Sequence, residues 1–408
     1  MLEALEGSQA IARAVAMCRP QVVAAYPITP QTHIVEGLSG LISSGTLSAQ
    51  YISVESEFSA ASVVMGASAA GSRSYTASAA QGILLMTEVL YNTAGLRIPT
   101  VMTVANRAVS APLSIWNDHQ DSMSVRDSGW IQLYCASNQE AVDTTIQAFF
   151  ISEKTEIPVM VCVDGYTLTH TLEPVDLPAQ EDVDAFLPPF RFRRTLDPGA
   201  PLTVGTLVSP DFFTEARYIN HQAIENAKEI IREADDLFFG LTGRRSGALI
   251  SQSGNPSGKT GVLVMGSVFG TLSDALASHD EKDQIRLLKL RSFRPFPNEE
   301  LREAVRGLET LIVLDRSLSP GSGGGILGME VRSALFGQKS APRIINAVAG
   351  LGGRDLPLSL LGSLVNLSKS PDTPEFLFAD IKRSRISEEI FPVKKTNHAE
   401  KSSWKNFP

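Results

Sequence analysis

From residue 8 to about residue 166 the chain alternates short apolar runs with segments of helical length, and this alternation limits the possible folds more than any other feature. Apolar strands that alternate with helices are covered on both faces, which predicts a parallel, doubly wound α/β sheet. The expected strands are 22–28, 51–55, 74–78, 99–106, 130–137 and 158–165. The expected helices are 8–18, 30–43, 57–70, 81–95 and 138–154. Ligands of such sheets bind at the carboxyl ends of the strands, so functional residues are expected there.

The rest of the chain predicts a second, smaller α/β domain. Residues 172–203 are rich in proline and aperiodic, which is typical of an extended segment, and a long helix follows to about residue 240. The stretch before residue 261 is rich in glycine and serine and predicts a linker. The expected organisation is a first domain at 1–245, a linker at 246–260, a second domain at 261–375 and a C-terminal arm at 376–408.

Charge and composition argue against several classes of protein. A formal charge of −8 without a basic run argues against nucleic acid as a partner. Cys18, Cys135 and Cys162 lie far apart, and the six histidines form no close pair in the sequence, so we expect reduced thiols and no metal site in this chain. No apolar run approaches the roughly 20 residues that cross a membrane, and we expect a cytoplasmic protein.

The turn YPITP, residues 26–30, follows the first expected strand. Pro27 and Pro30 fix the backbone and leave the Thr29 hydroxyl on a rigid corner at the carboxyl end of that strand. Two interpretations stay open: a stiff connection between strand and helix, or part of a binding site.

Glu55 and Glu57 follow the second expected strand, ahead of a helix built from small residues. Glu57 falls in the first helical turn, where the helix dipole favours a negative group. The small residues behind it allow the helix to approach a neighbouring backbone closely. Glu57 is therefore either a surface acid at a tightly packed helix or an acid beside a binding space.

A polar and aromatic insertion, residues 106–130, follows the fourth expected strand. Loops of this length in a compact α/β domain are usually functional. Arg107 begins the loop at the end of a strand and can bind a carboxylate with two parallel hydrogen bonds. Asp118, His119 and Asp121 fit either a metal site or, as we prefer, a hydrogen-bonded knot within the loop.

The glycine-rich stretch 319–331 lies between a strand and a helix of the second domain. It matches neither GxGxxG nor GxxxxGK[ST], so we interpret it as a closely packed turn and not as a phosphate site. The chain also lacks GDG followed by NN, the usual signature for thiamine diphosphate and magnesium.

Taken together, the motifs resemble the α subunit of the 2-oxoacid:ferredoxin oxidoreductases, above all the pyruvate type. They are, in order, YPITPQT, VESEFSAAS, AAQGILLM, ANRAVSAPLSIWNDHQD, VCVDGYTLTH, LRSFRPFP, VLDRS and LGGRD. The resemblance runs from about residue 5 to residue 356. It implies a doubly wound domain of the thiamine-diphosphate pyrimidine-binding type, followed by a smaller domain like the C-terminal domain of transketolases.

The resemblance also implies partners, because these enzymes divide their work among subunits. Thiamine diphosphate would be shared with a β subunit that holds the diphosphate and Mg²⁺. The [4Fe–4S] clusters would belong to ferredoxin-like and γ-type subunits. The complex would convert a 2-oxoacid and coenzyme A to acyl-coenzyme A and CO₂, with the electrons passed to iron–sulfur clusters in partner subunits, and this chain alone would be inactive.

Position by position, Glu57 matches the family's glutamate that bonds the pyrimidine ring of the cofactor, a role for which its carboxyl must carry a proton. The resemblance places Pro27 and Ile28 beside the cofactor as well. Thr29 and Arg107 match the residues that hold the carboxylate of the 2-oxoacid. The small residues behind Glu57 would then make room for an aromatic ring beside a buried acid.

Two departures from the family concern the substrate pocket. Ala79 and Ala80 precede Gln81 where many members carry a hydroxyl residue, and Phe58 follows the key glutamate where smaller or polar residues are common. We therefore hypothesise a pocket more apolar than a strict pyruvate site, for branched or aryl 2-oxoacids such as phenylglyoxylate.

Two other functions are weaker. A self-sufficient enzyme like transketolase requires the missing diphosphate signature. A non-catalytic scaffold or assembly subunit would be expected to lose Thr29, Glu57 and Arg107, and all three are present.

Overall fold

The computed structural model describes residues 2–386, which form two compact units. The first unit contains residues 2–251, Met265–Ser267 and Lys289–Glu300, and the second contains the intervening segments and the described residues from Leu301 onward. The predicted boundaries treated each domain as one continuous stretch. In the structure the chain returns to the first unit twice after leaving it.

A seven-stranded sheet forms the centre of the first unit, as the alternating pattern predicted. Its strands lie in the order β12 (Ser292–Arg294), β6 (Ile131–Tyr134), β7 (Val159–Asp164), β5 (Val101–Asn106), β4 (Ser74–Ser78), β2 (Val22–Ala25) and β3 (Gln50–Ser53). The strands from β6 to β3 pair in parallel, and β12 pairs antiparallel with β6. The carboxyl ends of β2, β3, β4, β5 and β7 therefore meet at one edge.

Helices connect and cover these strands. They are α1 (Gly7–Met17), α2 (Thr32–Ser43), α3 (Glu57–Ala69), α4 (Ala80–Leu85), α5 (Thr87–Gly95), α6 (Gln120–Ser124) and α7 (Asn138–Thr155). Most residues of α7 are buried, because this helix packs on the sheet, on α1 and on the long helix α9 (Pro210–Thr242). Ser137 caps α7 by accepting from Glu140 N at 3.2 Å, as its capping-box spacing predicted.

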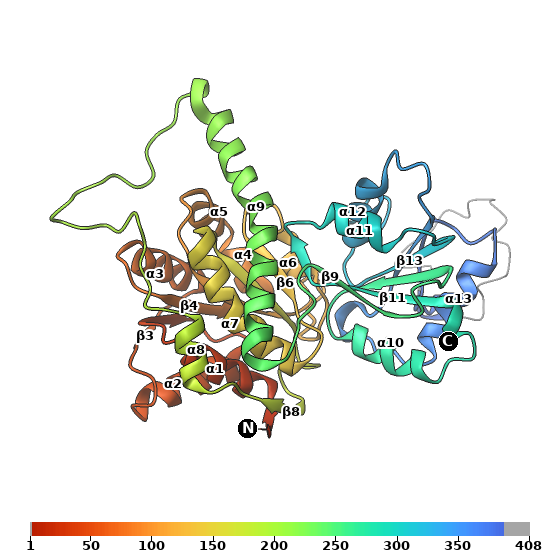
Figure 1. Cartoon of the computed structure of the whole chain (residues 1–408), viewed down its shortest axis with the longest axis horizontal. Helices are drawn as coiled ribbons and strands as arrows, with labels where there is room; N and C mark the ends of the chain where they lie inside the picture. The colour runs from red at the N-terminus through yellow and green to blue at the C-terminus, as the bar shows by residue number, and fades with distance from the viewer. Residues whose placement is uncertain (1, 387–408) are drawn as a thin grey trace. The chain divides into compact units, whose positions relative to one another are not determined.

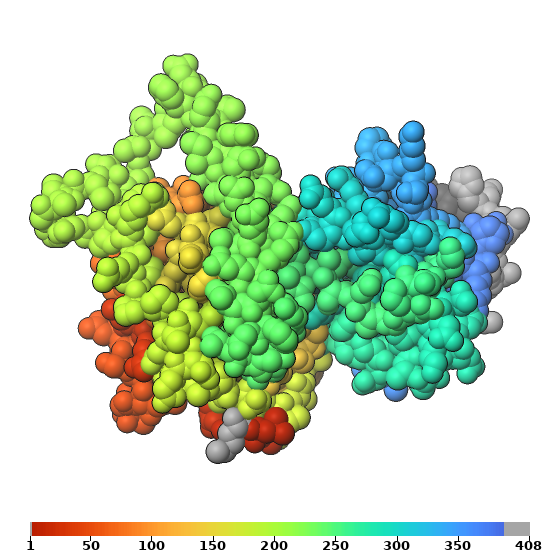
Figure 2. All heavy atoms as spheres, in the orientation of Figure 1, coloured from red at the N-terminus to blue at the C-terminus, as the bar shows by residue number. Residues whose placement is uncertain are grey.

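The proline-rich segment 172–203 is less irregular than the sequence predicted. It contains β8 (Leu172–Asp176), which pairs antiparallel with the N-terminal strand β1 (Leu2–Glu6), and the short helix α8 (Gln180–Phe186). The segment after α8 and the first turns of α9, drawn in light green, project beyond the rest of the first unit (Figures 1 and 2).

The second unit is built on a six-stranded sheet. Its order is β15 (Phe376–Phe378), β14 (Arg343–Val348), β13 (Thr310–Asp315), β10 (Thr260–Val264), β11 (Ile285–Leu290) and β9 (Ile250–Gly254). The helices are α10 (Val268–Ala277), α11 (Asn298–Ala304), α12 (Ile326–Leu335) and α13 (Leu360–Lys369), with short 3₁₀ turns at Lys282–Gln284, Leu351–Gly353 and Arg383–Arg385.

Two predicted boundaries need correction. Strand β9 lies inside the expected linker 246–260, and strand β15 lies inside the expected arm 376–408, of which residues 387–408 are outside the described part. Both segments have sequences with little apolar periodicity. They become strands because an existing sheet offers them a hydrogen-bonding partner at its edge.

The apolar run 285–293 divides into β11 and β12, which belong to different sheets. The division falls at Arg291, whose side chain is fully buried and donates to Ala248 O, Thr144 Oγ1 and Gln147 Oε1. These three acceptors anchor the chain in the first unit and account for the change of sheet.

The glycine-rich turn before α12 is closely packed, in agreement with its interpretation from the sequence. Gly325 N donates to Asn346 Oδ1 at 2.7 Å, and Gly328 N donates to Asp315 Oδ2 at 3.0 Å. A Cβ at Gly325 would lie 2.6 Å from Asp315 Cβ, closer than carbon atoms approach without a bond. The turn therefore needs glycine for the approach of its backbone.

Among the described residues, no helix has both the length and the apolar character to span a membrane.

Candidate active site

The segments that carry the predicted site residues meet at the carboxyl edge of the first sheet. The register pairs Ala25 with Ser53, Ser78 with Val104 and Asn106 with Asp164. The turn 26–30, the start of α3, the start of α4 and the loop after β5 therefore emerge side by side. This is where ligands bind in parallel sheets.

Gln31 holds the turn 26–30 against the sheet. Its side chain is fully buried, and its Nε2 donates to Ala77 O at 2.8 Å. Its Oε1 accepts from Ile28 N at 3.3 Å, and its own N–H donates to Ile28 O at 2.8 Å. The turn is thus fixed by a side chain as well as by its prolines, while Thr29 is exposed.

Arg107 reaches this turn from the loop after β5. Its Nη1 donates to Thr29 O at 2.9 Å, and its Nε donates to Ser114 O at 3.1 Å. The structure therefore brings Thr29 and Arg107 together, through the backbone of Thr29. Within the described chain Nη2 donates to no residue, although the side chain is only 7% exposed. A planar guanidinium held at two nitrogens leaves the third oriented for an anion.

Glu57 lies in the first turn of α3, as predicted, and is buried at 7% exposure. No described residue bonds its carboxyl group. Ser56 caps the helix by accepting from Ser59 N at 3.2 Å, so the cap does not use the Glu57 side chain. Burying a carboxyl group without a hydrogen-bonding partner destabilises the folded protein unless a bound molecule or another chain provides that partner.

The start of α4, whose Gly82 lies against this carboxyl, and the end of β4 carry buried polar atoms without partners. Ser78 Oγ and Gln81 Nε2 are buried and have no hydrogen-bond partner in the described part of the chain. A Cβ on Gly82 would lie 2.7 Å from Glu57 Cγ and 2.8 Å from Glu57 Oε1. The absence of a side chain at Gly82 is therefore what allows Glu57 to lie against the start of α4.

Asp121 forms hydrogen bonds with two of the segments of the site, the start of α4 and the loop after β5. Its Oδ2 accepts from Ala80 N and Arg107 N, each at 2.9 Å. Its Oδ1 accepts from Asn106 Nδ2 at 2.8 Å and from Ser122 N at 2.7 Å. Complete burial raises the pKa of Asp121 to about 6, and the four donors oppose that rise.

His119 forms a second buried contact of the loop. Its Nε2 lies 2.8 Å from Asp164 Oδ1 at the end of β7, and Asp164 Oδ2 accepts from Ser267 N at 2.9 Å. Asp118 Oδ1 accepts from Gln120 N at 2.9 Å. The loop is thus knotted by hydrogen bonds, which was the preferred interpretation of Asp118, His119 and Asp121.

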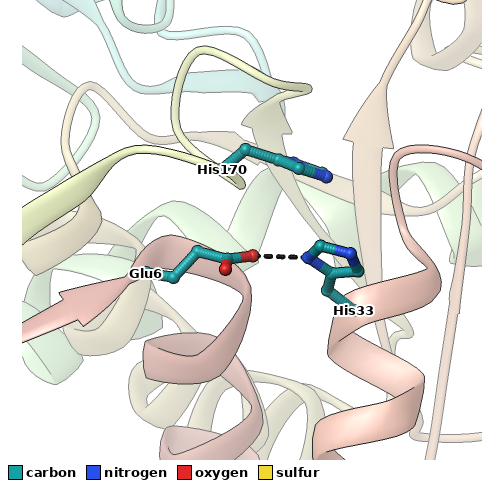
Figure 3. Close-up of side chains that lie close together, drawn as sticks. All are labelled: Glu6, His33 and His170. Carbon is teal, nitrogen blue, oxygen red and sulfur yellow. Dashed lines mark hydrogen bonds and ion pairs between the residues drawn. The ribbon is translucent and has the colours of Figure 1, made fainter.

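The fold also gathers two histidines that the sequence keeps apart. Figure 3 shows Glu6, His33 and His170 turned toward one another. Glu6 Oε1 lies 2.7 Å from His33 Nδ1, and the two imidazole centroids are 4.6 Å apart. Burial and the neighbouring His33 lower the pKa of His170. Carboxylate and imidazole groups are ligands that transition metals bind. Here the bond between Glu6 and His33 and the contact between the two imidazole rings explain why the three side chains lie together.

Two family models match the chain. Residues 13–236 match the one described as pyruvate flavodoxin/ferredoxin oxidoreductase, thiamine diphosphate-binding, and residues 259–360 match pyruvate:ferredoxin oxidoreductase core domain II. The chain belongs to the 2-oxoacid:ferredoxin oxidoreductases. It is an α subunit of this family, of the pyruvate type, as the motifs indicated.

Curated relatives of this oxidoreductase α subunit cover most of its length. Pyruvate synthase subunit PorA of Methanosarcina barkeri is 45% identical over 390 residues, which are 94% of this chain and 97% of the relative. Subunit PorA of Methanothermobacter thermautotrophicus is 44% identical, over 91% and 96%. Ketoisovalerate oxidoreductase subunit VorA of Pyrococcus abyssi is 42% identical, over 87% and 90%.

Solved structures support the fold of this oxidoreductase subunit. A 2-oxoglutarate:ferredoxin oxidoreductase of Magnetococcus marinus aligns with a TM-score of 0.69 at 17% identity, over 90% of this chain and 65% of that one. A split-gene transketolase aligns with a TM-score of 0.54 at 11% identity, over 90% of this chain and 98% of the other. The predicted architecture, a pyrimidine-binding type domain followed by a transketolase C-terminal-like domain, is confirmed.

The five predicted site residues of this α subunit differ in their contacts and in their exposure. Thr29 and Arg107 are in contact, whereas no hydrogen bond within the described chain joins either of them to Glu57. Pro27 is exposed and Ile28 is half-buried in the same turn. Their cofactor and substrate roles stay predictions.

Sequence reasoning missed three positions that shape the site. Gln31 and Gly82 lie within recognised motifs, but nothing in the sequence indicated the contacts that they make. Asp121 was noted only as part of a loop, because its partner Ala80 lies far away in the sequence. An aspartate in the first turn of a short helix was the available signal.

Proposed function

We propose that this chain is the α subunit of a thiamine-diphosphate-dependent enzyme that oxidatively decarboxylates a small 2-oxoacid. In the reaction the bond between the keto carbon and the carboxylate breaks and CO₂ leaves. A thioester forms with coenzyme A, and the two electrons released pass singly to iron–sulfur clusters. The observation that carries the proposal is the buried Glu57 carboxyl, which has no partner in the described chain.

The residues around Glu57 fit a cofactor ring. Ser78 Oγ and Gln81 Nε2 are buried without partners among the described residues, and Gly82 provides a close approach that a Cβ would fill. Thiamine diphosphate, when bound, supplies the carbon nucleophile that attacks the 2-oxoacid. Glu57 would donate its proton to a ring nitrogen, and the small residues of α3 and α4 would exclude water from that hydrogen bond.

Arg107 and Thr29 fit the carboxylate of the substrate. The guanidinium is fixed by Ser114 O and Thr29 O, so its remaining nitrogen can hold an anion without reorientation. Thr29 is exposed on the same turn. Arg107 and Thr29 would position the carboxylate of the substrate, and the guanidinium would neutralise its charge.

We propose pyruvate as the first substrate to test, since the first relatives named are pyruvate synthases. A branched or aryl 2-oxoacid is the alternative. Ala79 and Ala80 are fully buried, while Phe58 is 39% exposed at the start of α3 and can contact a larger acyl chain. Rates on pyruvate, 2-oxoisovalerate and phenylglyoxylate distinguish these substrates, and a clear preference for pyruvate would contradict the larger pocket.

A covering partner is supported by the surface of the site segments. Large exposed apolar side chains lie on the turn 26–30, at the start of α3, at the end of α4 and on the loop after β5. They are Tyr26, Phe58, Leu84, Leu85, Leu113, Ile115 and Trp116. Apolar groups gathered in this way are typical of an interface. We propose that a β subunit holding the diphosphate and Mg²⁺ covers them, with ferredoxin-like and γ-type subunits carrying the [4Fe–4S] clusters.

The alternative, a non-catalytic scaffold in such a complex, predicts a different result from one experiment. We would purify the native complex with an untagged β subunit and measure bound thiamine diphosphate and pyruvate-dependent dye reduction, with and without Glu57→Gln. Loss of turnover in an intact complex supports the catalytic role. Full turnover would support the scaffold.

We also propose that the complex works in the cytoplasm. The three cysteines are free and buried, and burial raises the pKa of the Cys135 thiol to about 12, so this thiol stays protonated. Localisation of the tagged chain by cell fractionation tests this.

A further inference from the structure

Asp121 is the one described carboxylate that bonds both halves of the candidate site. On one side its Oδ2 accepts from Ala80 N, at the start of the helix whose Gly82 lies against Glu57. On the other side the same oxygen accepts from Arg107 N, whose guanidinium contacts the Thr29 turn. Within residues 2–386 no hydrogen bond joins Glu57 or Gly82 directly to Arg107 or Thr29. Besides the pairing of β4 with β5 and the bond from Gln31 to Ala77 O, this shared oxygen links the two halves.

The chemistry at this position requires a carboxylate. Four N–H groups point at two oxygens, and a carboxylate is the side chain that offers two acceptors and no donor. An amide would present an NH₂ group to one pair of donors. The backbone of Ala80, with φ of 45°, adopts a conformation that non-glycine residues rarely take, and the bond from its N–H helps to hold it.

In the part of the chain that the structure describes, no cation pairs with this carboxylate. The Arg107 guanidinium is directed to Ser114 and Thr29, and His119 Nε2 is engaged by Asp164. Tyr134 and Cys162 are the titratable groups on the neighbouring strands, and burial raises the pKa of both well above the usual range, so both are neutral. The carboxylate is therefore stabilised by its four N–H donors.

We propose that Asp121 is a positioning residue that sets the spacing between the Glu57–Gly82 side of the site and the Arg107–Thr29 side. The inference rests on the proposed function of these two sides. It goes beyond that function because Asp121 touches neither cofactor nor substrate. It acts through the backbone of Ala80 and of Arg107.

The test uses Asp121→Asn in the reconstituted complex, with Tyr75→Phe as the matched control. Tyr75 OH donates to Thr103 Oγ1 at 2.7 Å, a buried hydrogen bond between the same strands β4 and β5 but away from their carboxyl ends. We expect Asp121→Asn to lower kcat/KM for the 2-oxoacid about 100-fold, with KM raised about tenfold, because small displacements of reacting groups cost rates of this order. Tyr75→Phe should lower the melting temperature and leave KM unchanged.

Two further readouts keep the inference testable. Hydrogen exchange of the amides in 79–82 and 106–109 should accelerate in Asp121→Asn, whether or not the complex turns over. In the wild type, KM should rise as the pH falls through about 6, where Asp121 takes up a proton and loses acceptor capacity. Asn106→Ala, which leaves both bonds to Oδ2, should change KM by less than about threefold.

The outcomes separate the inference from the proposed function. Unchanged exchange at 79–82 and 106–109 in Asp121→Asn, or a KM equal to that of the wild type, would overturn the positioning role. A wild-type complex that shows no 2-oxoacid turnover would overturn the proposed function, while faster exchange in the variant would still support the structural link. If Asp121→Asn does not fold, the positioning role is tested by the pH dependence of KM in the wild type, with Asn106→Ala as the comparison. A KM that does not rise as the pH falls through about 6 would overturn the role.

Discussion

Each of the two sheets of this chain has a buried carboxylate at or just after the end of a strand. The two carboxylates differ in how many hydrogen bonds they accept within the protein. In the first unit Glu57 is buried without a partner among the described residues, beside orphaned Ser78 and Gln81 atoms. In the second unit Asp315 accepts from Gly328 N and from Ser317 N and Oγ. Glu57 keeps its hydrogen-bonding capacity unused within the described chain, whereas Asp315 uses its capacity on two backbone N–H groups and one hydroxyl.

The comparison teaches how to distinguish a site from a turn. Both regions have a glycine pressed against a carboxylate: Gly82 on Glu57 and Gly325 on Asp315. Glycine content and a nearby acid are therefore shared features and do not indicate function. The difference lies in whether the hydrogen-bonding capacity of the acid is used inside the protein.

The largest expected effect is that of Glu57→Gln. The amide cannot supply the carboxyl proton, so we expect turnover of the complex to fall about 10³-fold with an unchanged melting temperature. The measurement is 2-oxoacid-dependent dye reduction. Glu55→Gln is the control, because Glu55 is exposed two residues earlier and should retain nearly full activity. Equal losses in both variants would remove the distinction between the two glutamates.

Arg107→Lys should come next. A lysine cannot contact Ser114 O and Thr29 O while offering a third nitrogen to an anion, so we expect KM for the 2-oxoacid to rise about tenfold or more. Steady-state kinetics over a range of substrate concentrations measure this. Arg126→Lys in the same loop is the control, and an equal KM in the two variants would contradict the role of Arg107.

Gly82→Ala and Gly325→Ala form a matched pair across the two units. Each adds one methyl group against a carboxylate, and overpacking of this kind costs about 1–3 kcal/mol. At Gly82 the displaced group is Glu57, so activity should fall about 10- to 100-fold. At Gly325 the melting temperature should fall while the activity per folded complex stays the same. Parallel activity loss at both positions would show that the second turn also serves catalysis.

The smallest functional effect is expected for Asp315→Asn. It weakens internal hydrogen bonds and should destabilise the second unit by about 1–3 kcal/mol. Thermal unfolding followed by circular dichroism measures that loss. The KM for the 2-oxoacid should not change, in contrast to Asp121→Asn, where an equally buried aspartate bonds the site segments.

The strands of the first sheet and the position of Glu57 could be predicted from the sequence because these depend on local pattern. Alternating apolar runs mark strands 22–28 and 99–106, and a helix start follows 51–55 within a few residues. The contact of Arg107 with the Thr29 turn followed from a resemblance and from the common edge of the sheet.

Other features depend on residues far apart in the chain, and no local pattern predicts them. Asp121 meets Ala80 only after β4 and β5 have paired, and His33 meets His170 across two different segments. The division of 285–293 depends on acceptors for Arg291 that lie in α7 and before β9. Such contacts are set by the tertiary structure.

Strand β12 limits where this protein can be truncated. It closes the outer side of β6 in the first sheet, yet it is encoded about thirty residues beyond the glycine- and serine-rich stretch where a truncation would naturally be placed. A fragment ending there would expose the backbone of β6 and invite strand-to-strand aggregation. A well-behaved first unit therefore needs Lys289–Glu300 supplied with it, as a covalent graft or as an added peptide.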